Sequence, residues 1–235
     1  MKVGLKKTKS KILILAVFMV VLAGRSFAEQ TFYRDSAWNK TYSKGMEQYN
    51  QNCAGCHGED GEGGMGLPLN LQSFLKVAPA DYIEKTIKYG RQDGSNDRIM
   101  PAFEKILTSR QIKNITTYIK GWQYEDSLPL QKSVKGNVKN GKELFKGMCI
   151  GCHGLNGEGG EIGLGHVVGT LKGFSAPSLS NKGFLKAASD GYIKATLMYG
   201  RVGTPMGAYL KGQQGFVELT EKDINDLVVY IRSLE

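Results

Sequence analysis

Two short stretches of the sequence repeat one arrangement of cysteine, histidine and glycine. Residues 52–64 read NCAGCHGEDGEGG and residues 148–160 read MCIGCHGLNGEGG, so Cys-x-x-Cys-His precedes a glycine-rich run in both. The chain has four cysteines, and all of them lie in these two motifs. Whatever fold the chain adopts must therefore build the same kind of site twice.

The repeat extends well beyond the two motifs. Residues 82–91 read YIEKTIKYGR and match residues 192–201, which read YIKATLMYGR. Residues 107–120 read LTSRQIKNITTYIK and match residues 219–232, which read LTEKDINDLVVYIR. Two copies are too few for a solenoid, so the pattern indicates a tandem duplication of one small domain. Pro, Ser and charged residues interrupt the helical patterns in residues 124–137, which favours a linker there. We expect an N-terminal domain over residues 29–128 and a C-terminal domain over residues 129–235.

Each copy has the pattern of three helices. A first helix leads into the Cys pair, a middle helix follows a long glycine-rich loop, and a final helix carries apolar residues three and four positions apart, as Ile112, Ile115 and Ile119 do. Thr108 and Thr220 stand where the N-caps of the final helices should be. No run alternates with a period of two for long enough to indicate a strand. The predicted class is all-α.

The N-terminus has the pattern of a secretory signal peptide. The basic start MKVGLKKTKSK precedes the twelve-residue apolar run ILILAVFMVVLA, which is short for a membrane span. Small residues at Ser26 and Ala28 then suit a signal peptidase, so we expect residues 1–28 to be removed by cleavage after Ala28. An uncleaved membrane anchor is the alternative, and the predicted location is the periplasm.

The basic character of the chain comes largely from this leader. The leader carries six basic residues and no acidic one, so its removal lowers the formal net charge from +9 to +3. The mature chain then offers no basic stripe of the kind that binds nucleic acid. Nucleic acid is therefore excluded as a partner.

Three structures other than haem attachment use paired cysteines. A zinc site would need ligands from both pairs, but Cys56 and Cys149 are far apart in different copies of the duplication. A thioredoxin-like dithiol follows a strand, whereas each pair here follows a predicted helix. Disulfides within Cys-x-x-Cys would be strained and would leave the adjacent histidines without a role.

Cys-x-x-Cys-His is the attachment signature of c-type haem. The two thiols add across the two vinyl groups of the porphyrin, and the next residue is then held beside the iron. Two haem c groups are thus predicted, attached through the four cysteines and ligated by the two histidines: Cys53, Cys56, His57, Cys149, Cys152 and His153. The glycines after each motif suit a backbone that turns or passes close to the porphyrin.

The second axial ligand is predicted to be methionine. One further histidine exists, His166, so two bis-histidine haems are excluded, and the thioether of methionine is a known ligand of haem iron. Met100 in RIMPAF and Met206 in TPMGAY both lie in loops before the final helix, next to a proline and within Met-x-Ala-aromatic. His166 is interpreted as a surface or haem-edge residue, with a competing distal ligand as the alternative.

These residues together resemble class I cytochrome c domains. The resemblance covers nearly all of residues 38–235, twice, so the chain is similar to the tandem di-haem cytochromes c of bacterial periplasms. It implies that the first and last helices of each domain cross at a small residue among aromatic rings, with Gly45 and Tyr49 meeting Tyr118. The same crossing would bring Gly141 and Phe145 to Tyr230. The second copy departs from the pattern by an insert that contains His166.

Two six-coordinate His/Met irons leave no open position for a substrate. The sequence thus predicts no catalytic residue and no small-molecule substrate, but a periplasmic carrier of single electrons between respiratory redox proteins, soluble or membrane-bound. One alternative is a haem-bearing subunit of a larger dehydrogenase or oxidase. Another is a di-haem enzyme, such as a peroxidase or thiosulfate dehydrogenase, which would need a vacant or weakly held iron.

Overall fold

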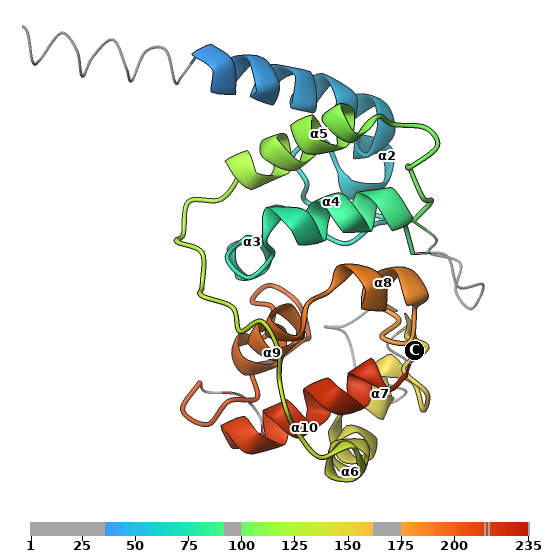
Figure 1. Cartoon of the computed structure of the whole chain (residues 1–235), viewed down its shortest axis with the longest axis vertical. Helices are drawn as coiled ribbons and strands as arrows, with labels where there is room; N and C mark the ends of the chain where they lie inside the picture. Colours follow the sequence, from blue (N-terminus) through green and yellow to red (C-terminus); the bar gives the residue numbers. More distant parts are fainter. Residues whose placement is uncertain (1–35, 92–99, 162–174, 214, 216, 235) are drawn as a thin grey trace, which may run out of the picture.

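The helices form two groups, one from each half of the chain. The structure is a computed structural model that describes residues 36–91, 100–161, 175–213, 215 and 217–234. A strip of chain after α5 runs along one side of the molecule and joins the two groups (Figure 1). This linker is tied to both groups, because Leu128 N–H donates to the Lys76 carbonyl (2.8 Å) and Val134 N–H donates to the Asp190 carboxylate (3.0 Å).

The two groups repeat one order of helices. The first has a helix over residues 36–52, then α2 (Ala54–His57), α3 (Gln72–Leu75), α4 (Ala80–Tyr89) and α5 (Ser109–Gly121). The second has α6 (Val138–Met148), α7 (Ile150–His153), α8 (Lys182–Ala187), α9 (Asp190–Tyr199) and α10 (Glu221–Arg232). The all-α class is confirmed. The predicted first, middle and final helices all form in both halves, which confirms the repeat.

The final helices begin where the sequence predicts. Thr108 and Gln111 form a reciprocal capping box at the start of α5, and Thr220 and Asp223 do so at the start of α10. Each pair satisfies backbone N–H groups that have no partner within the helix. The N-terminal ends of α5 and α10 are thus fixed by local sequence.

The first and last helices of each group cross at a glycine. A Cβ on Gly45 would stand 2.8 Å from the carbonyl carbon of Asn114, and beyond this crossing the rings of Tyr49 and Tyr118 pack 5.3 Å apart. The second group repeats this packing with Phe145 and Tyr230, whose ring centroids are 5.2 Å apart. The predicted crossings are therefore confirmed in both copies.

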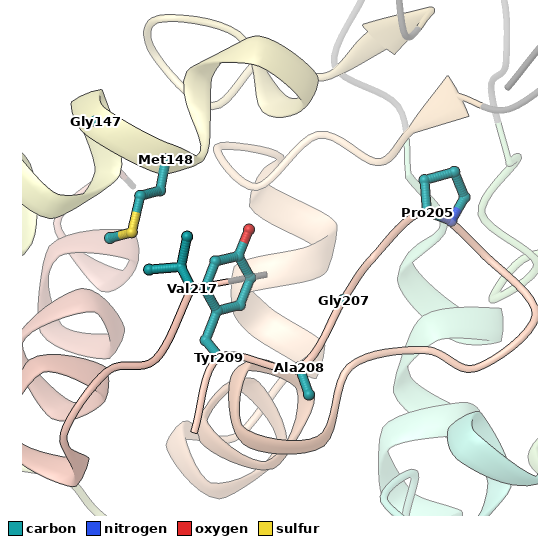
Figure 2. Close-up of a pocket in the computed structure, with 7 residues that line it drawn as sticks. All are labelled: Gly147, Met148, Pro205, Gly207, Ala208, Tyr209 and Val217. Carbon is teal, nitrogen blue, oxygen red and sulfur yellow. The ribbon is translucent and has the colours of Figure 1, made fainter. Parts of the chain in front are cut away.

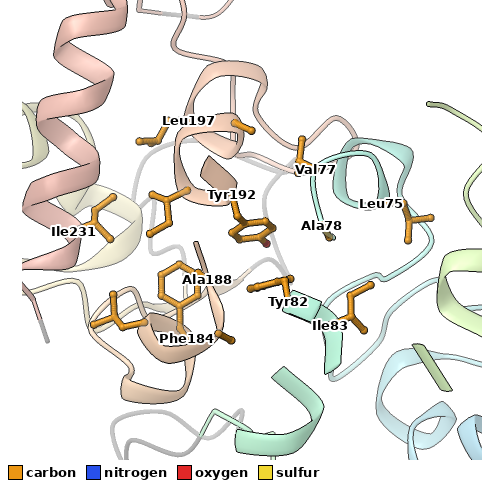
Figure 3. Close-up of a cluster of buried hydrophobic side chains, with 14 of the residues drawn as sticks. Leu75, Val77, Ala78, Tyr82, Ile83, Phe184, Ala188, Tyr192, Leu197 and Ile231 are labelled. Atoms are coloured by element: carbon orange, nitrogen blue, oxygen red, sulfur yellow. The ribbon is translucent and has the colours of Figure 1, made fainter. Parts of the chain in front are cut away.

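The cores of the two groups are continuous. Figure 3 shows Tyr82 of the first group beside Tyr192 and Phe184 of the second, while Leu75 and Ile83 continue the same cluster into the first group. These side chains come from α3 and α4 on one side and from α8 and α9 on the other. Since both faces are apolar, burying them against each other stabilises one arrangement of the two groups.

Some elements were not predicted from the sequence. The short helices α3 and α8 have too few turns to show an apolar period, although Asn181 caps α8 by accepting from Phe184 N–H (2.9 Å). A two-residue antiparallel pairing of β1 (Gly160–Glu161) with β2 (Ser175–Ala176) flanks part of the insert. The predicted leader and His166 lie outside the described residues. Among the described helices, none is long and apolar enough to cross a membrane.

Candidate functional site

Each Cys-x-x-Cys-His motif forms a single helical turn after the first long helix of its group. Cys53 N–H donates to the Tyr49 carbonyl (2.7 Å) and His57 N–H donates to the Cys53 carbonyl (2.9 Å). The second copy has the same bonds, from Cys149 to Phe145 and from His153 to Cys149 (both 2.8 Å). The structure thus brings both thiols and the imidazole of each motif onto one turn, α2 or α7, with equal geometry.

A backbone carbonyl orients each histidine ring. His57 Nδ1 lies 2.8 Å from the Leu67 carbonyl oxygen, and His153 Nδ1 lies 3.0 Å from that of Pro177. A carbonyl only accepts, so Nδ1 carries the proton and Nε2 keeps a lone pair for a metal. Burial lowers the pKa of both imidazoles, although the bond to the carbonyl opposes this, and the neutral form that binds iron is favoured.

The acceptor carbonyls were missed in the sequence, although the glycine-rich loops that carry them were noticed. A Cβ on Gly66 would stand 2.7 Å from the His57 ring, so glycine is needed for the loop to pass this close. In the second copy, Gly159 (φ 72°) adopts a left-handed conformation, and a Cβ there would meet the Ala176 carbonyl at 2.6 Å. Close backbone approach is the reason for glycine at both positions.

The first thiol of each motif has the wrong pKa for a redox dithiol. Burial, and then the neighbouring thiols of Cys56 and Cys152, raise the pKa of Cys53 and Cys149 to about 12. A reactive dithiol instead needs a lowered thiol pKa. All four cysteines are free in the structure. Within the described ranges, no three His, Cys, Asp or Glu side chains gather as a metal ion would require.

A cavity of about 310 Å³ adjoins the second motif. It lies between the end of α6 and the loop around Met206, and it is lined by Gly147, Met148, Pro205, Gly207, Ala208, Tyr209 and Val217 (Figure 2). Burial, and then the thiols of Cys149 and Cys152, raise the pKa of Tyr209 to about 12. Cys149, Cys152 and His153 are not among the residues that line this cavity, so it adjoins the motif without containing its side chains.

The two predicted methionines occupy equivalent loops. The carbonyls of Met100 and Met206 accept from Arg91 N–H (2.8 Å) and Arg201 N–H (2.7 Å), and both side chains pack half-buried against the core. Gly200 ends α9 at φ 66°, and a Cβ there would meet the Met206 carbonyl oxygen at 2.7 Å. Each methionine loop is thus held against the end of the middle helix, and in the second copy both neighbours of Met206 line the cavity.

Comparison with known families agrees with this geometry. Residues 138–235 match the family model described as cytochrome c, and residues 40–119 match the one described as cytochrome c oxidase, cbb3-type, subunit III. The chain is a tandem di-haem cytochrome c. It carries two haem c groups, and the free thiols and the neutral imidazoles of the two motifs fit such a group. The matched segments lie within the two domains predicted from the repeat, whose boundaries stay a prediction.

Relatives of this cytochrome resemble both of its domains. Subunit FixP of the cbb3-type cytochrome c oxidase of Bradyrhizobium diazoefficiens is 28% identical over 82% of this chain and 60% of its own length. Subunit CcoP of the cbb3-type oxidase of Azospirillum sp. is 31% identical over 81% of this chain and 61% of its own. The chain thus spans about three-fifths of the length of these curated relatives. A solved structure, the Kuenenia stuttgartiensis reducing HAO-like protein complex Kustc0457/Kustc0458, is 21% identical, with 81% of this chain and 95% of that chain covered and a TM-score of 0.44.

Proposed function

We propose that this cytochrome is the electron-transfer subunit of a cbb3-type cytochrome c oxidase or of a closely similar respiratory complex. The observation that carries the proposal is the match of both domains, over four-fifths of the chain, to proteins named as subunits of such oxidases. The match of residues 40–119 to a cbb3 subunit family supports it as well. The sequence alone favoured a free electron carrier and gave a subunit of a larger oxidase as the alternative. These matches favour the alternative.

The residue assignment of the haem sites belongs to the same proposal. Thioether bonds would form at the four cysteines: Cys53 and Cys149 at the N-caps of α2 and α7, and Cys56 and Cys152 within these helices. His57 and His153 would ligate through Nε2, because Nδ1 is engaged with a carbonyl in each case. Met100 and Met206, in the two equivalent loops, would supply the sulfur ligands.

The haem iron, when bound, supplies a one-electron redox couple. The chain's own groups tune this couple: the Leu67 and Pro177 carbonyls hold the histidine rings in one tautomer and orientation. Thioether ligation and burial of the site favour the reduced state. With both axial positions filled, the subunit would pass single electrons to the oxidase and perform no bond chemistry itself.

We place the two cytochrome domains in the periplasm, as the exported N-terminal pattern indicates. The electron donor and acceptor would then be redox proteins that meet the domains there, and the acceptor would be another subunit of a membrane complex. The relatives' names support a membrane partner of this kind.

The partner can be tested in the organism that makes this cytochrome. A strain that lacks the chain would be complemented with an affinity-tagged wild type or with the double variant Cys53→Ser, Cys56→Ser, which cannot hold the first haem. We expect the wild type to co-purify from detergent-solubilised membranes with the other oxidase subunits and to restore oxygen uptake by those membranes. The variant should not restore it. Recovery of the wild type alone, with oxygen uptake unchanged by its loss, would favour the free carrier.

A further inference from the structure

The two domains meet through a stacked pair of tyrosines at equivalent positions. Tyr82 lies on α4 and Tyr192 on α9, and their ring centroids are 3.9 Å apart with an interplanar angle of 23°. Both side chains are buried, at 3% and 6% exposure, and they point toward each other across the domain boundary (Figure 3). The pair is thus a direct aromatic contact between the two halves.

An arginine bonds each of these tyrosines. Arg91 donates to the Tyr82 hydroxyl, and Arg201 donates to the Tyr192 hydroxyl (2.9 Å). Each guanidinium also packs over a ring of the opposite domain, Arg91 over Phe184 (5.0 Å) and Arg201 over Phe74 (5.6 Å). Since these four contacts form two matching pairs, this part of the boundary has an approximate two-fold symmetry.

The same arginines are bonded to the methionine loops. Arg91 N–H donates to the Met100 carbonyl and Arg201 N–H donates to the Met206 carbonyl. A continuous series of contacts therefore runs from Met100 through Arg91 and Tyr82 to Tyr192, and onward through Arg201 to Met206. Every step is a covalent bond, a hydrogen bond or the ring stack. We call this series the inter-domain path.

We propose that the inter-domain path is the route by which electrons cross between the two haem sites. The proposal rests on the proposed ligation by Met100 and Met206, since these residues join the ends of the path to iron. It assigns a role to Tyr82 and Tyr192, the repeated tyrosines of the middle helices, which take no part in the haem sites as described above.

The transfer is balanced and involves no bond chemistry. One electron leaves the reduced site and enters the oxidised one, no bond forms or breaks, and neither tyrosine is oxidised. Burial raises the pKa of Tyr82 well above its usual range although the Arg91 charge opposes this, so the phenol stays protonated. The path therefore serves as a bridging medium only.

The test is the rate of electron exchange within the half-reduced holoprotein, measured by nuclear magnetic resonance exchange between haem-methyl signals at several protein concentrations. We expect Tyr82→Leu, which removes the stacked ring, to slow the concentration-independent exchange by about tenfold or more. Tyr82→Phe keeps the ring and loses the bond from Arg91, so its exchange rate should fall less. This second variant keeps the proposal testable if the first does not fold.

A matched control comes from another contact across the same boundary. Lys186 Nζ lies 3.8 Å from the centroid of the Tyr89 ring, which is not part of the path. Tyr89→Leu should leave the exchange rate unchanged. Equal rates in wild type, Tyr82→Leu and Tyr82→Phe would overturn the proposal, as would equal slowing by Tyr82→Leu and Tyr89→Leu, which would assign the interface a purely structural role.

The visible spectrum separates this outcome from a failure of the haem assignment. If the wild type shows sulfur-to-iron charge transfer at both haems, the methionine ligation is supported. The exchange rates then test the inter-domain path alone. If that band is absent, the assignment of Met100 and Met206 as iron ligands is wrong, and the inter-domain path no longer connects the two irons.

Discussion

The backbone of Gly141 packs against the backbone of Asp226, and a Cβ on Gly141 would stand 2.6 Å from the Asp226 carbonyl carbon. This contact fixes the crossing of α6 and α10. It places the turn with Cys149 and His153 at a set distance from the last helix, because α7 follows α6 directly. The haem-binding turn is thus positioned by a contact between two backbones.

Gly141→Ala should therefore destabilise the second domain. Overpacking of a tight contact costs ~1–3 kcal/mol or more, and a backbone neighbour cannot move aside as a flexible side chain can. Denaturant unfolding of the holoprotein measures this loss. Lys142→Ala, at the exposed neighbouring position of the same helix, is the control and should change the free energy of unfolding little. Equal stability of the two variants would show that the crossing can open to admit a methyl group.

Asp226 should make the second domain sensitive to acid. Burial alone would raise the pKa of its carboxyl, but hydrogen bonds from Asn137 N–H (2.6 Å), Asn140 (2.9 Å) and Lys222 (3.0 Å) outweigh this and hold the pKa below its usual range. The lowered pKa stabilises the fold above about pH 3.9, the usual aspartate value, and this stabilisation is lost as the pH falls through the folded-state pKa.

The matched variant is Asp226→Asn, since Asn114 is the equivalent residue of the first domain. It should lower the free energy of unfolding of the second domain by ~1.5–3 kcal/mol at pH 7, the usual worth of hydrogen bonds to a charged group. It should also flatten the dependence of that free energy between pH 5 and pH 2. An unchanged acid transition would mean that another group controls it.

Removing both thiols of one motif should remove one haem. In the double variant Cys53→Ser, Cys56→Ser, no thioether can form on α2, so the covalent haem content should fall from two to one. The intact mass and the haem-to-protein ratio measure this. We also expect the first domain to lose its fold, whereas Cys149→Ser with Cys152→Ser should affect the second domain instead. Retention of two covalent haems in either variant would contradict the attachment assignment.

Replacement of Met100 should open one iron without detaching its haem. In Met100→Ala the thioether is lost but the Cys53 and Cys56 attachments stay, so the first haem should become reactive toward carbon monoxide when reduced. Met65→Ala is the control, because Met65 is 61% exposed and lies just after the motif. An unchanged spectrum in Met100→Ala would assign the distal ligand to another residue.

Much of the fold and of the candidate site could be predicted from the sequence because the duplication supplies each signal twice. Local patterns predicted the helices and the caps at Thr108 and Thr220, whereas the crossings at Gly45 and Gly141 were expected only from the resemblance to class I cytochrome c domains. Hydrogen bonds to a backbone carbonyl have no comparable signal in the sequence. The acceptors for His57 and His153 are carbonyls, and a carbonyl is present whatever the side chain is.

The packing of the two domains against each other could not be predicted either. The repeated tyrosines and arginines of the middle helices were visible in the sequence, but both copies carry them, and a repeat predicts equivalent positions without predicting contact between them. The stack of Tyr82 on Tyr192 depends on how α4 meets α8 and α9, which only the three-dimensional structure establishes. Both domain boundaries and all site residues stay predictions until tested.

The most direct test of the account is the ligation of the two irons in the purified wild type. The ferric protein would be examined by visible and electron paramagnetic resonance spectroscopy, and carbon monoxide would then be added to the reduced form. The account predicts two low-spin haems, sulfur-to-iron charge transfer at both, and no carbon monoxide binding. A high-spin or carbon-monoxide-reactive haem would contradict it and would indicate an enzyme site at the open iron.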